Sequence, residues 1–347
     1  DYFYGNLVGE VDYFTKDRGG IIDWQRNGTF LKEDGYYTEL IGDEAVKIIE
    51  QDRGEKPLFL YFASLAPHSP YEVPKKYFDL YPSIQDTNRR TYAAMITALD
   101  DQVGRIREAL EKKGMLENTL IIFTSDNAGP INPLFATGAR SPNEREKSGW
   151  LGKDQKTPVS NSPFSGGKGS LHEGGVRVPA LWFWPSKLKP HSVEAVMGHA
   201  DLMPTLLSLA GATGSGGHPF DGKNMWPALT EAAPSPHEDI LINVEAVRGA
   251  VRKGNWKLIK WAAFPGKTEL YDLSKDPGEK NNLAEKFPEV TRDLEARLMA
   301  YAQEQKTSEW IKVQPQFLGA QGKTVFDPDF DIDDGGLPRE KPNLPSP

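Results

Sequence analysis

Two short apolar runs on either side of one long amphipathic helix constrain the fold of this chain more than any other feature. Residues 58–64 read LFLYFAS and residues 120–125 read LIIFTS, and both have the length and side-chain content of buried strands. Between them, from about Arg90 to Lys113, apolar residues recur at spacings of three and four, and Gly114 follows as a C-terminal stop. The order strand, helix, strand favours a right-handed crossover. We therefore predict an α/β fold with a mostly parallel sheet flanked by helices.

The remaining pattern predicts a second, smaller subdomain. A helix is expected at 37–51, a buried strand at 179–184 and a helix at 199–211, followed by a loop rich in Gly and Pro up to about residue 236. Beyond it, four short segments at 240–244, 248–252, 256–261 and 269–273 precede a helix at 288–304, which is typical of an antiparallel sheet with one covering helix. The expected domains are 1–236, 237–310 and an irregular tail at 311–347.

Composition excludes several classes of partner and site. The chain has 347 residues, a formal net charge of -8 and no basic cluster, so neither nucleic acid nor an anionic membrane surface is expected as a partner. Its longest apolar stretch, residues 57–67, is too short to cross a bilayer. Without cysteine, the chain can form no disulfide, thiolate metal site or cysteine nucleophile. Nothing in the sequence predicts an oligomeric state.

Asp126 and Asn127 directly follow the apolar run at 120–125. Ligand sites of open α/β sheets lie beyond the carboxyl ends of strands, and calcium or magnesium prefers carboxylate and amide oxygens. The pair is therefore a candidate for metal binding. The alternative is a simple turn, because both side chains readily hydrogen-bond their own backbone.

Lys168 stands between glycines in the run GGKGSLHEGGVRVP, which begins at Gly166. Glycine lets the backbone approach a ligand closely and leaves the ammonium as the local functional group, so an anion is the expected ligand. A nucleotide P-loop is excluded because Ser162 and Gly169 occupy positions where that motif needs glycine and Ser or Thr. The alternative is a solvated lysine on a flexible loop.

His68 follows the run at 58–64 and lies between Pro67 and Pro70, a turn that restricts where its ring can lie. It could donate to an anion or act as an acid, or serve a structural role. His172, Glu173 and Arg177 are assigned to the scaffold, because Glu and Arg four residues apart commonly pair with each other. The other histidines lack partners at metal-ligand spacing, and a structural role is expected for each: His191, His199, His218 and His237.

Taken together, the ordered segments of this chain resemble the sulfatase family, and in particular its arylsulfatase B-like (N-acetylgalactosamine-4-sulfatase-like) branch. The resemblance spans about residues 1–305 and is carried by APHSPYEVP, RRTYAAMITALDDQVGRI, NTLIIFTSDN, GGKGSLHEGGVRVPALWFWP, HADLMPTLLSLAG and ELYDLSKDPGEKNNLA. It implies an alkaline phosphatase-like fold and a calcium-dependent sulfuric ester hydrolase acting on a sulfated carbohydrate or an aryl sulfate, with magnesium as the alternative ion. By the same resemblance Asp126 and Asn127 would be calcium ligands, Lys168 would bind the sulfate and its bridging oxygen, and His68 would contact the sulfate or assist the leaving group.

The family's nucleophile has no counterpart in this sequence. It is a formylglycine made from Cys or Ser in a C/S-x-P-x-R motif, and the nearest run, Ser141 to Arg145, has its proline one place early. We therefore expect a fragment that lacks the amino-terminal part of a sulfatase. The alternatives are a phosphoester or phosphonate hydrolase of the same superfamily, and a non-catalytic truncated product. The resemblance also implies a periplasmic, extracellular or lysosomal location.

Overall fold

A computed structural model describes residues 2–51, 56–132, 157–212, 217–245, 247–262 and 265–305. The chain forms two compact units. The first contains the described residues up to 120 together with 130–132 and 157–160, and the second contains 121–129 and the described residues from 161 to 305. Among all these residues, no helix has the length and apolar character needed to cross a membrane. The run Ser141 to Arg145 and the predicted tail at 311–347 lie outside the described residues.

The first unit is built on two packed helices, α1 (Tyr37–Glu50) and α3 (Thr87–Lys112). It also contains the short helix α2 (Lys75–Phe78) and the 3-10 helix η1 (Leu116–Asn118). The strands β1 (Tyr4–Gly5), β4 (Gln25–Arg26) and β5 (Thr29–Phe30) form a small antiparallel sheet, and β2 (Asp17–Arg18) pairs with β3 (Ile21–Ile22). The predicted helices at 37–51 and 90–113 are thus confirmed. Asp86 caps α3 by accepting a hydrogen bond from the Arg89 amide at 2.6 Å, and Gly114 follows with φ of 67°.

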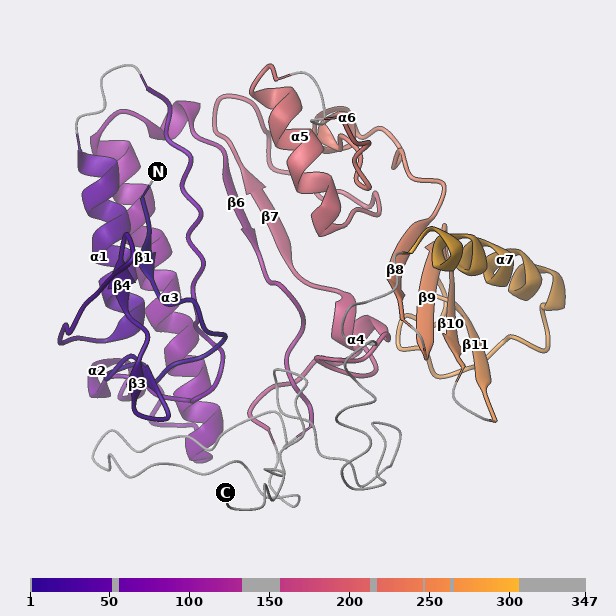
Figure 1. The fold of residues 1–347 in the computed structure, drawn as a ribbon, viewed down its shortest axis with the longest axis horizontal. Helices are drawn as coiled ribbons and strands as arrows, with labels where there is room; N and C mark the ends of the chain where they lie inside the picture. The colour runs from indigo at the N-terminus through magenta and orange to yellow at the C-terminus, as the bar shows by residue number, and fades with distance from the viewer. Residues whose placement is uncertain are drawn as a thin grey trace, which may run out of the picture. The chain divides into compact units, whose positions relative to one another are not determined.

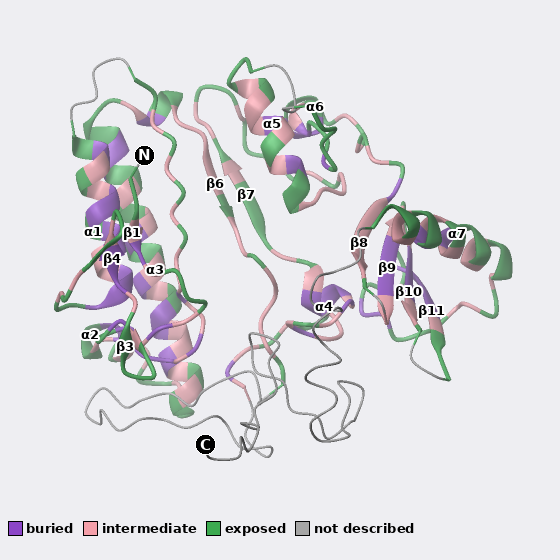
Figure 2. Cartoon of the chain, viewed as in Figure 1, coloured by how far each residue is buried: buried purple, intermediate pink, exposed green. Residues whose placement is uncertain are grey.

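An aromatic cluster forms the core of this unit. Side chains from the residues before α1 pack against α1, α3 and the segment around residue 71. Figure 2 colours the buried stretches of these elements purple. The buried members are Val11, Tyr13, Trp24, Tyr36, Tyr37, Ile41, Ala66, Tyr71, Val73, Tyr77, Ala94, Met95 and Ala98. Tyrosine is well suited to such a core because its ring buries apolar area while its hydroxyl can reach a polar partner.

The second unit contains a two-stranded ribbon, several short helices and a four-stranded sheet (Figure 1). Its strands are β6 (Ile121–Thr124), β7 (Ala180–Phe183), β8 (Ile240–Val244), β9 (Arg248–Lys253), β10 (Trp256–Trp261) and β11 (Lys267–Asp272). Its helices are α4 (Glu173–Val176), the 3-10 helix η3 (His199–Asp201), α5 (Leu202–Leu209), α6 (Trp226–Glu231) and α7 (Pro288–Glu304). The antiparallel sheet and helix expected for 237–310 are both formed, whereas the domain limits at 236 and 310 stay a prediction.

The four-stranded sheet buries both of its faces. Strand order is β11-β10-β9-β8, and side chains alternate between the faces because successive residues of a strand point in opposite directions. Val251, Leu258 and Leu270 pack against α7 on one face. Ala250, Ile259 and Tyr271 lie on the other face and pack against Leu171, a residue of the glycine-rich run.

Two sequence predictions fail in the described residues. The segment at 58–64 forms no strand and joins no ladder, and Phe59 and Tyr61 are each 82% exposed. A strand requires hydrogen-bond partners for its backbone amides and carbonyls. The apolar content of this segment does not predict whether a neighbouring strand supplies them. The predicted strand at 120–125 is formed as β6, which pairs antiparallel with β7. In addition, α6 occupies part of the stretch that was predicted to be a loop.

Candidate functional site

Asp126 and Asn127 form a turn at the end of β6. The Asn127 amide donates to Asp126 Oδ1 at 2.9 Å, and Asn127 Nδ2 donates to Asp126 Oδ2 at 2.6 Å. The Asp126 side chain is nevertheless on the exposed side of the turn. Among the described residues no group of three or more His, Cys, Asp or Glu side chains could hold a metal ion. The side chains thus make the local hydrogen bonds of a turn, their oxygen donors are of the type that calcium accepts, and metal binding by the pair stays a prediction.

Lys168 lies in a tightly folded segment, residues 165–176, which we call the lysine strap. The Gly174 amide donates to the Ser165 carbonyl at 2.7 Å, and the Ser170 amide donates to the Gly167 carbonyl at 2.8 Å. A Cβ on Gly174 would lie 2.4 Å from the Ser165 carbonyl oxygen, closer than any side chain tolerates. Glycine is therefore required there because the strap folds back on its own backbone.

The metal-candidate turn and the lysine strap share one hydrogen-bonded frame. The Lys168 amide donates to the Gly129 carbonyl at 3.2 Å, and the Ala128 amide donates to the Gly175 carbonyl at 3.2 Å. Asn161 joins the same groups: its Nδ2 donates to Gly129 O at 2.8 Å and to Gly166 O at 3.2 Å, while its Oδ1 accepts from the Gly129 amide. The structure thus brings together the turn that follows β6 and the strap that carries Lys168.

Asn161 was missed by sequence reasoning. Its only signal was its position just before the glycine-rich run, and asparagine is common in turns for many reasons. Arg248 was missed in the same way. It lies on β9, and its Nη1 donates to the Gly169 carbonyl, one residue from Lys168, at 2.7 Å.

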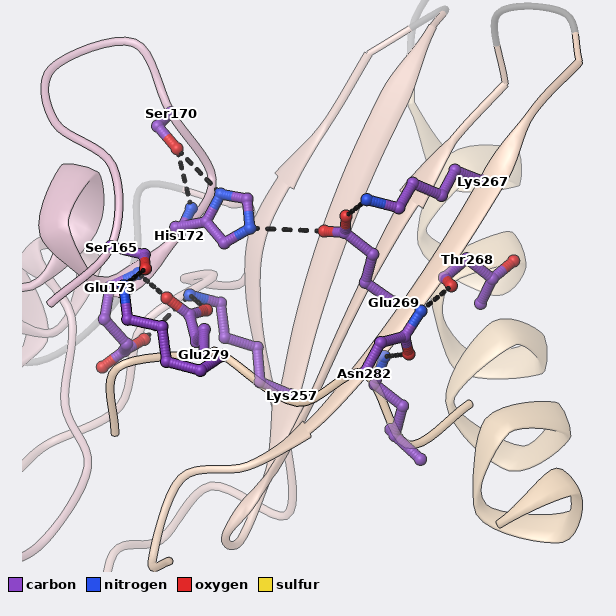
Figure 3. A network of polar contacts seen from close by, with 12 residues as sticks. Ser165, Ser170, His172, Glu173, Lys257, Lys267, Thr268, Glu269, Glu279 and Asn282 are labelled. Carbon is purple, nitrogen blue, oxygen red and sulfur yellow. Dashed lines mark hydrogen bonds and ion pairs between the residues drawn. The ribbon is translucent and has the colours of Figure 1, made fainter. Parts of the chain in front are cut away.

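The strap is also joined to the four-stranded sheet by polar side chains (Figure 3). His172 Nε2 lies 3.3 Å from Glu269 Oε2, and its Nδ1 lies 3.1 Å from Ser170 Oγ. Glu173 contacts Lys257 of β10 at 2.8 Å and Arg177 at 3.7 Å. The predicted pairing of Glu173 with Arg177 is confirmed, as are scaffold contacts for His172.

His68 is described within the first unit. Its Nδ1 lies 2.7 Å from the Ser69 carbonyl and 3.6 Å from Glu10 Oε2, and its own carbonyl accepts from the Tyr13 hydroxyl at 2.9 Å. The His68 amide donates to Leu65 O at 2.8 Å, which closes a turn. These contacts fix the loop that carries the ring, and the role of His68 in a site with Lys168 stays a prediction.

Three of the other histidines make contacts outside the lysine strap. His237 Nε2 lies 2.7 Å from the buried carboxylate of Asp201, which also accepts from the amides of Gly198 and Lys223. His191 Nδ1 contacts the Lys189 carbonyl, and His199 Nε2 lies 3.5 Å from Thr124 Oγ1. His237 thus pairs with a buried carboxylate, and the structural role expected for it stays a prediction.

Comparison with known proteins gives matches to related families over residues 2–305. Residues 2–212 match the family model described as Sulfatase, and residues 167–305 match the model described as N-sulphoglucosamine sulphohydrolase, C-terminal. Arylsulfatase J of Mus musculus is 28% identical over 91% of this chain and 58% of its own length. Arylsulfatase A of Homo sapiens is 32% identical over 73% of this chain and 50% of its own length. The chain thus spans about half the length of these curated relatives.

Further matches include a bacterial enzyme and solved structures. N-acetylgalactosamine-6-O-sulfatase of Bacteroides thetaiotaomicron is 29% identical over 79% of this chain and 52% of its own length. The crystal structure of Ps i-CgsB aligns with a TM-score of 0.73 at 28% identity, covering 88% of this chain and 67% of that one. Phosphonate monoester hydrolase of Agrobacterium radiobacter aligns with a TM-score of 0.53 at 20% identity over 87% of this chain and 64% of that one, a likeness of fold alone.

Proposed function

Because the chain belongs to the sulfatase family, we propose that it supplies part of the active site of a sulfuric ester hydrolase. The fold is alkaline phosphatase-like. The observation that carries the proposal is the shared frame of Gly129, Asn161 and the lysine strap, which joins an oxygen-rich turn to a lysine-bearing loop. Such a combination suits an ester that carries a negatively charged sulfuryl group.

In this proposal the ammonium of Lys168 binds the sulfate group and its bridging oxygen. Hydrolysis breaks the bond between sulfur and the ester oxygen, that oxygen leaves as an alcohol after taking a proton, and an oxygen derived from water completes the sulfate ion. His68 is the group that we assign to the sulfate or to the leaving oxygen. Lys168 lowers the barrier by balancing negative charge that builds up on the sulfuryl and bridging oxygens.

Asp126 and Asn127 would hold part of a calcium site, with magnesium as the alternative. Both present oxygen donors, but calcium takes about six to eight oxygen ligands, so this pair supplies only part of the shell. When bound, the ion would add positive charge near the sulfuryl oxygens. We expect the 347-residue chain to bind calcium only weakly, with a Kd of about 1 mM or higher. A tight isotherm in a calcium titration would contradict this.

The nucleophile is proposed to lie outside these 347 residues. The chain contains no cysteine, and no C/S-x-P-x-R run that could give formylglycine occurs in it. We therefore expect no turnover when the chain alone is incubated with calcium and an aryl sulfate or a sulfated oligosaccharide. Measurable release of sulfate would show that the chain carries its own nucleophile and that this part of the proposal is wrong.

A sulfated carbohydrate is the proposed substrate class. One support is that Ps i-CgsB, at 28% identity, has been solved in complex with k-i-k-neocarrahexaose. Another is that the bacterial relative is named for N-acetylgalactosamine 6-O-sulfate. An aryl sulfate is the alternative, in keeping with the names of the arylsulfatase relatives. The family also supports a periplasmic, extracellular or lysosomal location for the proposed enzyme.

The role of Lys168 can be tested without catalysis. The wild-type chain is treated with a limiting amount of acetic anhydride, with and without sodium sulfate at constant ionic strength, and acetylation is quantified at each lysine by mass spectrometry. We expect sulfate to slow acetylation of Lys168 and to leave the exposed Lys187 unchanged. Equal rates at Lys168 with and without sulfate would remove the main support for the proposal. Sodium phosphate in a parallel experiment tests the phosphoester alternative.

A further inference from the structure

Three buried charges lie beneath the lysine strap. The Lys257 ammonium is 2.8 Å from Glu173 Oε1 and 2.9 Å from Glu279 Oε1, and the three side chains are between 0% and 4% exposed. Charges are rarely buried to this extent, because each must give up its hydration and is stabilised only by close partners. One buried ammonium here serves two buried carboxylates.

The cluster joins three separate parts of the second unit. Lys257 belongs to β10, Glu173 begins α4 within the strap, and Glu279 lies in a turn after β11. On β10, Lys257 shares a face with Ile259, the face that packs against Leu171 of the strap. Lys257 therefore points from the middle of the sheet towards the strap rather than towards α7.

The turn that carries Glu279 is held in an unusual conformation. Glu279 has φ of 54°, in the left-handed region that residues with a Cβ rarely adopt. Asp276 stabilises the turn by accepting hydrogen bonds from the amides of Lys280 and Asn281, each at 2.8 Å. Such strain persists only where surrounding contacts fix it, and the buried ion pair with Lys257 is one of those contacts.

Both sides of the strap are attached to this turn. Before Lys168, Ser165 Oγ donates to the Gly278 carbonyl at 2.6 Å, and after Lys168, the Glu173 amide donates to Glu279 Oε2 at 2.6 Å. The Gly174 amide closes the strap on itself through the Ser165 carbonyl. Lys168 thus lies in a loop whose two ends are held by adjacent residues of one turn.

We infer that Lys257 is a positioning residue for Lys168, because its buried ammonium holds Glu173 and Glu279 together and so fixes both ends of the lysine strap. The inference rests on the proposed function in one respect, namely that Lys168 binds an anion. Arg177 and Arg252 are the other cations near Glu173. Arg177 is half exposed at 3.7 Å, and burial lowers the pKa of Arg252 while Glu173 opposes that shift. Neither replaces Lys257, since Lys257 alone contacts both carboxylates in the described residues.

Hydrogen exchange of the 347-residue chain tests the inference without any activity assay. In Lys257→Met, two buried carboxylates lose their common partner, so we expect the strap amides of Ser170, Gly174 and Gly175 to exchange about tenfold faster or more. The matched control is Lys260→Met on the same strand, where the lysine is 44% exposed and pairs with Glu295 on the surface. That control should leave strap exchange unchanged.

A second variant keeps the test decisive if Lys257→Met does not fold. Glu173→Gln preserves the shape of the side chain and leaves Lys257 paired with Glu279, so the fold should survive while the charged link to the strap is lost. We expect faster exchange in the strap and unchanged exchange in β9 and β10. Unchanged strap exchange would overturn the inference, and so would an equal increase throughout β9, β10 and β11, because that would indicate a general structural role.

The acetylation experiment then separates this inference from the proposed function. If sulfate protects Lys168 in the wild type, protection should be reduced at least about threefold in Glu173→Gln, because the strap no longer holds the ammonium in place. Retention of full protection together with a loosened strap would overturn the positioning role. If sulfate fails to protect Lys168 even in the wild type, the proposed function fails, and the exchange data still decide whether Lys257 fixes the strap.

Discussion

The two units of this chain hold their candidate site residues by different chemistry. In the first unit, neutral tyrosine hydroxyls hold the loop that carries His68: the Tyr13 hydroxyl donates to the His68 carbonyl, and the Tyr36 hydroxyl donates to the nearby Glu72 carbonyl at 3.0 Å. In the second unit, the buried charges of Lys257 and its two carboxylate partners hold the lysine strap. Of the twelve tyrosines in the sequence, only Tyr271 and Tyr301 lie beyond residue 120. The His68 loop should therefore be sensitive to alkali, and the lysine strap to the loss of charge or of glycine.

The largest expected effect comes from raising the pH above 10. Burial raises the pKa of five core tyrosines of the first unit, Tyr13, Tyr36, Tyr37, Tyr71 and Tyr77. Above pH 10 these tyrosines ionise in the unfolded chain and not in the folded one, so the free energy of unfolding falls as the pH rises. Each of these tyrosines lowers the free energy of unfolding by about 1.4 kcal/mol per pH unit, until the pH reaches its pKa in the folded protein.

The second unit should lose less stability over the same range. Burial, with Asp239 as the next cause, raises the pKa of Tyr301 to about 12, and Tyr271 is the other tyrosine there. We expect hydrogen exchange, corrected for the intrinsic exchange rate at each pH, to show that α1 and α3 open between pH 10 and 11. Strands β9 and β10 should open only at a higher pH. Simultaneous opening, or earlier opening of the sheet, would contradict the distinction between the two units.

Substitution of a strap glycine should have the next largest effect, and it should be confined to the second unit. In Gly174→Ala the new Cβ would meet the backbone carbonyls of Ser165 and Gly166 at 2.4 and 2.5 Å, and backbone atoms cannot move aside easily. We expect a loss of about 3 kcal/mol in the free energy of urea unfolding of that unit. The control is Gly104→Ala in α3, where a Cβ meets nothing within 4 Å and where a gain of about 0.5 to 1 kcal/mol is expected.

Loss of the Asn161 side chain should have the smallest of the three effects and should separate the turn from the strap. Asn161→Ala removes its hydrogen bonds to Gly129 and Gly166, at a cost of about 2 kcal/mol. We expect faster exchange of the Ala128 and Lys168 amides, which link the two segments. Asn224→Ala is a matched control, because its bonds to Ser208 and Trp226 lie elsewhere in the second unit. Equal effects of both substitutions on the Ala128 amide would argue against a shared frame.

The sequence predicted helices and the C-terminal sheet well because their signals are local. α3 has a cap, a periodic apolar face and a stop glycine, and the β8–β11 segments are separated by turn residues. The segment at 58–64 has equally strong apolar content, yet it forms no strand, because strand formation depends on a neighbour that the sequence of the segment does not specify. The same limit explains why the antiparallel pairing of β6 with β7 was not predicted.

For the candidate site, sequence reasoning proposed residues that lie within short motifs. The structure joins the segments that carry Asp126, Asn127 and Lys168, while the roles of these residues stay predictions. Asn161, Arg248 and Lys257 were missed because each acts on a segment distant in sequence, and an ordinary Asn, Arg or Lys carries no mark of its partner. Lys257 did leave one signal, since WKLIKW at 256–261 places charges in a strand that is otherwise apolar.

The strap is attached to residues that come much later in the sequence, so these attachments should form late in folding. Ser165 contacts Gly278 across 113 residues, and Glu173 contacts Glu279 across 106. During synthesis the strap leaves the ribosome long before its partners exist, and contacts so distant in sequence form late. A nascent chain that ends before β10 carries Lys168 but lacks Lys257 and Glu279, which fix both ends of the strap, so the complete anion-binding geometry should be among the last properties the protein acquires as it is made.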